Sequence, residues 1–321
     1  MALGSIREYF KYKMYLKSLP YSLYKFENVE NFTKRKEKKA LKMMSKRSKN
    51  ITQRTYIVPT HEGRSVTVYT YERLNNHRES SSIVLFIHGG GWGASNWSYY
   101  HHYCKHLASV LDALIVSLDY HVSPEYKFPT QIDDCYYVLS WLENACEYWQ
   151  IDKDRIYLYG ESSGANIASV VSRIARDRKH PRINGQILVT PITDARLETK
   201  SYTTYKETPT LTKEHMRDYL DVYLNDQSEV FNPSVSPLLV NANFLLPKTF
   251  IISAEYDPLH DDADLYAKQL LSANVPCLYY ECPKAYHNFI FSKYAPNIKE
   301  IEYMMNLFIS GAPIERIISR I

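Results

Sequence analysis

Short apolar runs recur along most of this chain, and each is bounded by polar or turn-forming residues. The runs are Ile83–Ile87, Leu114–Leu118, Ile156–Tyr159, Gln186–Thr190, Thr249–Ser253 and Cys277–Glu281. Segments this short and this rich in branched and aromatic residues are typical of strands buried on both faces of a sheet.

Helical patterns lie between these runs. Apolar residues recur at steps of three and four from Ile132 to Cys146, and the stretch from Ala165 to Ile174 is apolar almost all round. Strands alternating with helices predict an α/β fold, with a mostly parallel central sheet and helices on both faces. Ahead of them, Thr55–Pro59 and Ser65–Tyr71 alternate between polar and apolar residues, which predicts an antiparallel hairpin at the start of the sheet.

Two stretches do not fit this alternation. The interval from Thr190 to Thr249 is far longer than a single crossover needs, and it includes a helix-like stretch from Thr212 to Leu224. The N-terminal stretch is instead basic and aromatic. We expect both to form a helical cap over the carboxyl ends of the strands. The expected organisation is an N-terminal cap segment at 1–50, a core at 51–190, a cap insertion at 191–245 and the rest of the core at 246–321.

Charge and composition exclude several classes of function. Against 35 Asp and Glu, the 39 Lys and Arg leave a net charge of +4, so no nucleic acid partner is expected. No apolar run is long enough for an integral membrane segment. The 5 cysteines show no spacing typical of a zinc site, so no metal or cofactor is expected, and a reducing, cytoplasmic location fits best. A homodimer is left open.

A candidate nucleophile stands at a strand-to-helix junction. Gly160-Glu161-Ser162-Ser163-Gly164 has the pattern Gly-x-Ser-x-Gly, which is weak evidence alone because short patterns arise by chance. Here the strand Ile156–Tyr159 precedes it and an apolar helix follows. A sharp turn between the two would expose the Ser162 hydroxyl at a helix N-terminus, where a developing anion is stabilised.

A glycine run follows an earlier strand. In His88-Gly89-Gly90-Gly91-Trp92, three consecutive glycines let backbone N–H groups approach a substrate oxygen without interference from side chains. An oxyanion hole needs such donors, and loss of one typically raises the barrier by about 3 kcal/mol. A plain flexible turn would explain the glycines but not their position after this strand.

A general base and its orienting acid should follow the nucleophile, each after a late strand. Asp257 follows Thr249–Ser253, and His287 follows Cys277–Glu281. Other residues could fill either role: three further acids lie near Asp257, and four further histidines lie earlier in the chain. The competing acids are Glu255, Asp261 and Asp262, of which the last two fit a capping role for the helix expected there. The competing histidines are His101, His102, His106 and His121, none of which follows the last strand.

Taken together, these residues resemble the hormone-sensitive-lipase-like esterases, a branch of the α/β-hydrolase fold that includes arylacetamide deacetylases. The matching segments are His88–Trp92, Asp119–Glu125, Gly160–Gly164, Asn232–Leu238, Asp257–Leu259 and His287–Phe289, and they span about two thirds of the chain. The resemblance implies a catalytic triad of Ser162, Asp257 and His287. It also implies an oxyanion hole formed by the backbone of Gly89, Gly90 and Ser163.

The chain departs from the family pattern at three positions. Ser163 stands where alanine is usual, Ala165 where glycine is usual, and Asn288 where glycine is common. None of these changes removes a reacting atom. Only the N–H of Ser163 is needed for the oxyanion hole, and asparagine tolerates left-handed backbone angles.

The expected function is hydrolysis of small-molecule carboxylic esters with short-to-medium acyl chains, through an acyl-enzyme intermediate. Two alternatives remain. An amidase or formamidase would use the same triad on a different leaving group. A non-catalytic small-molecule receptor on a hydrolase scaffold would need no base, although relatives of that kind lack the histidine that this chain has as His287.

Overall fold

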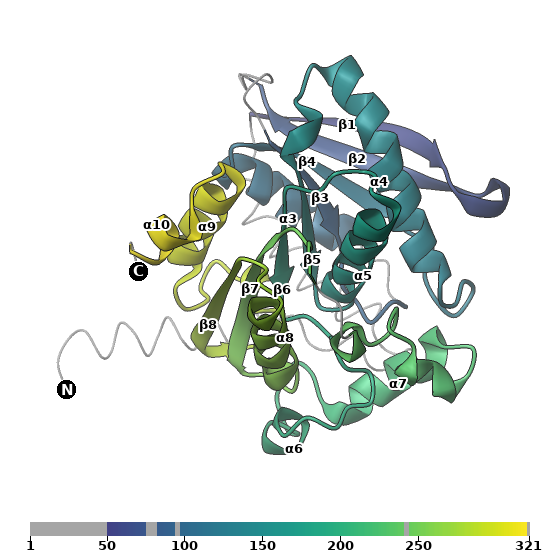
Figure 1. Cartoon of the computed structure of the whole chain (residues 1–321), viewed down its shortest axis with the longest axis vertical. Coiled ribbons are helices and arrows are strands. Elements are labelled where there is room, and N and C mark those ends of the chain that lie inside the picture. Colours follow the sequence, from purple (N-terminus) through teal and green to yellow (C-terminus); the bar gives the residue numbers. More distant parts are fainter. Residues whose placement is uncertain (1–49, 75–81, 94–96, 241–243, 320–321) are drawn as a thin grey trace.

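The computed structural model describes residues 50–319, except 75–81, 94–96 and 241–243 (Figure 1). The predicted N-terminal cap segment, apart from Asn50, therefore lies outside the described residues. No described helix is long and apolar enough to cross a membrane. All 5 cysteines of the chain are free and buried.

One eight-stranded sheet forms the centre of the molecule, in the order β1-β2-β4-β3-β5-β6-β7-β8. The first two strands pair antiparallel, β2 also pairs antiparallel with β4, and the remaining neighbours are parallel. The strands are β1 Ile51–Pro59, β2 Ser65–Arg73, β3 Ser82–Ile87, β4 Ala113–Asp119, β5 Ile156–Glu161, β6 Gly185–Val189, β7 Lys248–Tyr256 and β8 Cys277–Tyr286. The predicted fold, with its initial hairpin and its later parallel strands, is confirmed.

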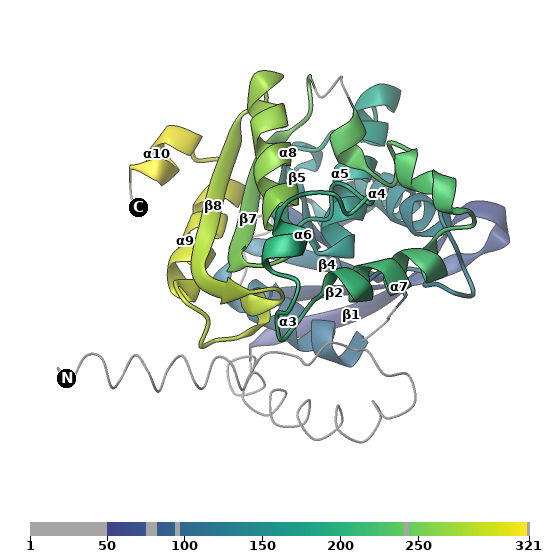
Figure 2. The ribbon, with the colours of Figure 1, turned by 90° about the horizontal axis from the view of Figure 1, so that it is seen from below.

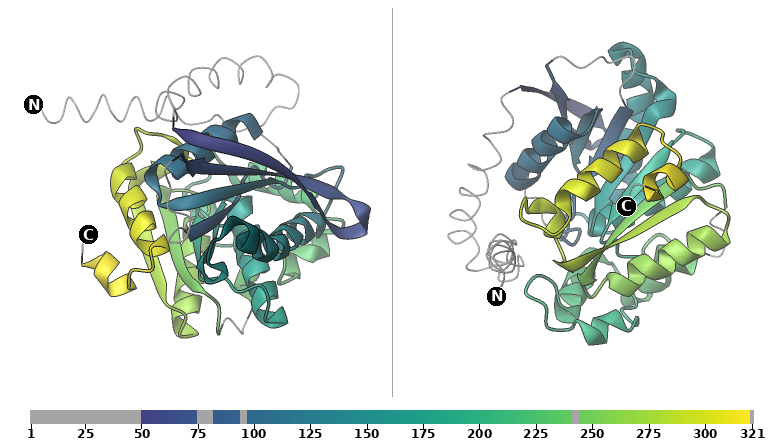
Figure 3. Two further views of the ribbon diagram at one scale, coloured as in Figure 1. Left: turned by 90° about the horizontal axis from the view of Figure 1, so that it is seen from above. Right: turned by 90° about the vertical axis from the view of Figure 1, so that its left-hand side faces the viewer.

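Helices cover both faces of the sheet (Figure 3). One core cluster lies under α4 and α5 and includes α8, and the other lies under α3 and α9 and includes α10. The longer helices are α3 Trp97–Val110, α4 Thr130–Trp149, α5 Ser163–Arg178, α7 Lys213–Tyr223, α8 His260–Ser272 and α9 Ile298–Ile309. The short ones are α6 Ser201–Thr204, α10 Ile314–Ile318, η2 His61–Gly63, η4 Lys153–Arg155, η5 Gln227–Phe231, η6 Pro237–Leu239 and η7 Phe289–Phe291.

The long interval between β6 and β7 contains α6, α7, η5 and η6. Viewed from below, α6 and α7 lie across the end of the molecule that faces the reader (Figure 2). The side chain of Thr212 accepts a hydrogen bond from the backbone N–H of His215 and so caps α7. Three buried residues of α7, Met216, Leu220 and Tyr223, belong to the same core cluster as α5. The helix predicted for this interval is therefore present and packed on the core.

The capping role predicted for Asp261 and Asp262 is wrong. Helix α8 begins at His260, and its N-cap is Leu259, which makes no side-chain capping hydrogen bond. Both aspartates lie in the first turn and bond segments outside the helix. Asp261 accepts from the N–H of Ser201 at 2.8 Å, and Asp262 accepts from the N–H of Thr193 at 2.9 Å. They fasten the segment that follows β6 to the start of α8.

Candidate active site

The predicted site residues meet at one edge of the sheet, because parallel strands end on the same side. In the register of the ladder, Ile87 at the end of β3 pairs with Gly160 of β5, and Glu161 pairs with Val189 at the end of β6. The loops that follow β3, β5, β7 and β8 therefore leave the sheet together.

Ser162 occupies a strained turn between β5 and α5. Its backbone angles are φ 54° and ψ −121°, a region that residues with a side chain rarely adopt. The Ser162 N–H donates to the carbonyl oxygen of Val189 at 2.9 Å, which fixes the turn against β6. A Cβ atom at Gly164 would lie 2.1 Å from the carbonyl oxygen of Ile87, so only glycine lets helix α5 start this close to β3.

A continuous hydrogen-bonded chain joins the three predicted triad residues. The Nε2 atom of His287 lies 3.0 Å from the hydroxyl oxygen of Ser162, and its Nδ1 atom lies 2.8 Å from Oδ2 of Asp257. All three side chains are buried, with Ser162 the most exposed at 6%. A nucleophile, a base and an acid that orients the base stand in this order in serine hydrolases.

Asp257 is held by the turn that follows β7. Its second carboxylate oxygen, Oδ1, accepts the N–H of Leu259 at 2.9 Å, so both oxygens have partners. The competing acids bond elsewhere. Glu255 accepts the N–H of Lys284 at 2.7 Å, while Asp261 and Asp262 hold the segment after β6.

The competing histidines also have other partners or positions. His101 bonds the hydroxyl of Tyr71, His106 bonds Glu302, and His121 bonds Asp134. His102 lies on α3 together with His101 and His106. Of the histidines considered, His287 is the one that the structure brings to Ser162.

The environment of His287 sets its affinity for a proton. Burial lowers the pKa of His287, but the charge and hydrogen bond of Asp257, helped by the charge of Glu161, raise it, and the net shift is upward. A raised pKa makes the imidazole a stronger base and stabilises the imidazolium that forms when it takes a proton.

Glu161 is a site residue that the sequence analysis did not single out. Its side chain is 1% exposed, and within the described residues neither carboxylate oxygen has a hydrogen-bond partner. Its Oε1 lies 3.9 Å from Nε2 of His287, and its other oxygen lies against Gly89, only 2.2 Å from where a Cβ atom would stand there. Burial raises the pKa of Glu161 to about 7, although the charge of His287 opposes the shift. Glu161 is the variable residue in Gly-x-Ser-x-Gly, so the sequence pattern gave no sign that it is buried beside His287.

The glycine run lies beside the start of α5. Gly90 and Gly91 have φ of 106° and 60°, and none of the loop and turn hydrogen bonds of the described residues uses the N–H of Gly89 or Gly90. Ser163 is the first residue of α5, so its N–H has no acceptor within the helix. Donors of this kind, next to a nucleophile, suit a developing oxyanion.

The family model for the alpha/beta hydrolase fold matches residues 84–291. The chain belongs to this family. Among known proteins, it is 32% identical over 216 residues to an arylesterase from Saccharolobus solfataricus, which covers 67% of this chain and 70% of the relative. It is 33% identical over 218 residues to the carboxylesterase NlhH from Mycobacterium tuberculosis, across 66% of this chain and 68% of the relative.

Solved structures agree with this assignment. A hyperthermophilic esterase from the archaeon Pyrobaculum calidifontis superposes with a TM-score of 0.81 at 25% identity, covering 97% of this chain and 98% of that one. The predicted family and fold are thereby confirmed.

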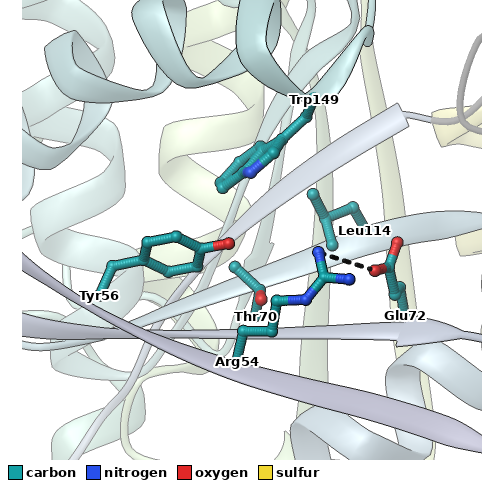
Figure 4. A pocket seen from close by; sticks show the side chains of 6 residues that line it. All are labelled: Arg54, Tyr56, Thr70, Glu72, Leu114 and Trp149. Atoms are coloured by element: carbon teal, nitrogen blue, oxygen red, sulfur yellow. Dashed lines mark ion pairs between the residues drawn. The ribbon is translucent and has the colours of Figure 1, made fainter.

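A separate shallow cleft lies far along the sheet from these residues, beside the initial hairpin (Figure 4). The space between its lining residues is about 160 Å³ and is open to solvent, and Arg54 lies 3.7 Å from Glu72 across it. Tyr56 and Trp149 form one wall, with ring centroids 5.7 Å apart. None of its lining residues follows the end of β3, β5, β7 or β8, so we do not connect it with the candidate active site.

Proposed function

We propose that this protein is a serine carboxylesterase in which Ser162 is the nucleophile, His287 the general base and Asp257 the residue that orients the base. The observation that carries the proposal is the hydrogen-bonded chain from Ser162 through His287 to Asp257, at 3.0 and 2.8 Å. Relatives named arylesterase and carboxylesterase, from two distant organisms, support the reaction class.

The proposed reaction has two halves. The Ser162 hydroxyl attacks the ester carbonyl carbon while Nε2 of His287 takes its proton, and the N–H groups of Gly89, Gly90 and Ser163 bind the oxyanion. The tetrahedral intermediate collapses, and the alcohol leaves with the proton from His287. Water then attacks the acyl-enzyme with His287 again as base, which releases the acid and restores Ser162.

We propose small esters with short-to-medium acyl chains as substrates. The support is the insertion at 191–245, which packs α7 against the glycine run: a Cβ atom at Gly91 would lie 2.0 Å from the ring of Tyr219. We propose that this insertion and the segment at 1–50 form a cap. Free, buried cysteines support a cytoplasmic location. The homodimer that the sequence left open stays a proposal, and the molar mass of the protein in solution tests it.

Hydrolysis of p-nitrophenyl esters from acetate to laurate, by the wild type and Ser162→Ala, tests the reaction. Loss of the nucleophile from an intact triad typically lowers kcat about a million-fold, so we expect no saturable activity in the variant. The best chain length of the wild type would define the acyl preference.

A matched set of ester and anilide substrates separates esterase from amidase. Activity that survives in Ser162→Ala would contradict the assigned nucleophile. A folded wild type that hydrolyses neither class would contradict the enzyme itself and favour a receptor.

A further inference from the structure

The side chain of Ser163 joins the two parts of the proposed oxyanion hole. Its hydroxyl oxygen accepts the backbone N–H of Trp92 at 3.2 Å. Trp92 ends the glycine run after β3, whereas Ser163 begins helix α5. The hydrogen bond therefore links the loop that carries Gly89 and Gly90 to the residue that supplies the third N–H.

Tyr120 holds the other end of the glycine run at His88. Burial raises the pKa of Tyr120, and the nearby Ser163 hydroxyl partly offsets the rise. Tyr120 in turn donates its hydroxyl hydrogen to the carbonyl oxygen of His88 at 2.9 Å, and its ring stacks on the His88 ring with centroids 4.1 Å apart. The residues on both sides of Gly89–Gly91 are thus each held by a hydroxyl group, Trp92 by that of Ser163 and His88 by that of Tyr120.

The glycine run needs such ties. Three consecutive glycines have the widest choice of backbone conformations, and a useful oxyanion hole must hold its donors in place before the charge develops. The carbonyl oxygen of Trp92 accepts the N–H of Ser123 at 2.9 Å, and its N–H donates to Ser163, so both backbone polar groups of Trp92 are bonded.

We infer that the hydroxyl of Ser163 is a positioning group that fixes the glycine run against the start of α5 and so sets the spacing of the oxyanion donors. The inference rests on the proposed esterase mechanism and deepens it. It also gives a role to a departure from the family pattern, since alanine, which is usual at this position, has no such hydroxyl.

The test compares Ser163→Ala with Ser172→Ala. Ser172 lies on the same helix, is 1% exposed, and within the described residues its hydroxyl has no hydrogen-bond partner. The measurements are kcat and KM on p-nitrophenyl butyrate, Ki for an alkyl trifluoromethyl ketone, and the melting temperature. The ketone adds to the nucleophile as a tetrahedral oxyanion, so its affinity reports on the hole.

We expect Ser163→Ala to lower kcat about 10-fold, less than the loss from deleting a donor itself, because the donors remain but are held less firmly. Both halves of the reaction use the same hole, so KM should stay within about twofold while Ki for the ketone rises about as much as kcat falls. Ser172→Ala should change none of these values by more than about twofold.

Tyr120→Phe provides a second variant that acts on the other end of the run. It should lower kcat and weaken ketone binding in the same direction as Ser163→Ala, because both variants loosen the same short glycine run. If kcat and Ki for Ser163→Ala remain within twofold of the wild type, or KM rises while kcat is unchanged, the inference is wrong. Ser162→Ala is assayed in parallel as a test of the esterase mechanism itself. Activity that remains in Ser162→Ala would mean that the mechanism is wrong, whereas an inactive Ser162→Ala beside an unaffected Ser163→Ala would mean that only the inference about Ser163 is wrong.

Discussion

At the scale of single residues, the chemistry of the site rests on the hydrogen-bonded chain of Ser162, His287 and Asp257 and on the buried Glu161 beside it. Ser162, Asp257 and His287 stand after strands in the order that the fold requires, and the structure brings their side chains within hydrogen-bonding distance. Glu161 could not be found in this way, because its importance comes from burial and from its 3.9 Å approach to His287, neither of which leaves a mark on a five-residue pattern. The roles of Ser163 and Tyr120 depend in the same way on contacts between distant segments.

The charge of Glu161 should appear in the pH dependence of the reaction. The acid limb of kcat/KM reports the pKa of the base, and activity is lost as the pH falls through that value, since protonated His287 cannot accept a proton. Glu161 helps to raise the pKa of His287. In Glu161→Gln that contribution is absent, so we expect the acid limb to move to lower pH than in the wild type.

Measurement of kcat/KM between pH 5 and pH 9 on a neutral ester checks this shift. Glu302→Gln is the matched control, because Glu302 pairs with His106 and the change should leave the acid limb where it is. An acid limb of Glu161→Gln that stays in place or moves upward would show that Glu161 does not act on His287.

At the level of elements, the strands were easier to predict than the helices. Each apolar run became a strand with ends displaced by a few residues, because burial on both faces demands unbroken apolar sequence. Helix α3 was not predicted. Its buried positions, among them Tyr103, Cys104 and Leu107, are interspersed with histidines and a lysine, so no clear apolar period was visible.

Helix α7 should support both stability and catalysis through Tyr223. The Tyr223 ring stacks on Trp92 with centroids 4.4 Å apart and planes 3° from parallel, and Trp92 ends the glycine run. Replacing a buried aromatic residue by alanine costs about 3–5 kcal/mol. We expect Tyr223→Ala to lose stability by that order in urea denaturation and to lower kcat as well.

Tyr223→Phe is the control for this change. The Tyr223 hydroxyl is buried, and across the described residues it has no hydrogen-bond partner, so its removal should leave stability within about 1 kcal/mol and kcat within about twofold. Equal losses in both variants would mean that the hydroxyl, and not the stacked ring, is what matters.

For the whole molecule, the class of fold followed from the alternation of strands and helices, but the order of the strands did not. In the sheet, β4 lies between β2 and β3, and β3 lies beside β5. The pairings of β2 with β4 and of β3 with β5 do not follow the order of the chain, because long-range pairing is decided by the packing of the complete sheet and leaves no local signal. The stretches predicted to form a cap were recognised only as interruptions of the regular pattern.

Deletion of residues 1–49 tests the proposed cap at this scale. If the segment helps to enclose the substrate, the shortened protein should lose about tenfold or more in kcat/KM for p-nitrophenyl butyrate, because water exclusion and substrate positioning both suffer. Retention of full activity together with an unchanged melting temperature would show that the segment is not part of a cap. A shortened protein that binds the trifluoromethyl ketone but turns over slowly would support the prediction.

The position of β8 at the edge of the sheet affects how the protein loses activity when it is destabilised. This strand carries His287 just past its end, and it pairs with β7 alone, while the nucleophile follows β5 in the interior of the sheet. Edge elements open locally at a lower free energy than the centre of a sheet. A brief opening of β8 would move the His287 imidazole away and leave Ser162 in place. We therefore expect mild heat or denaturant to abolish activity reversibly before the protein unfolds as a whole.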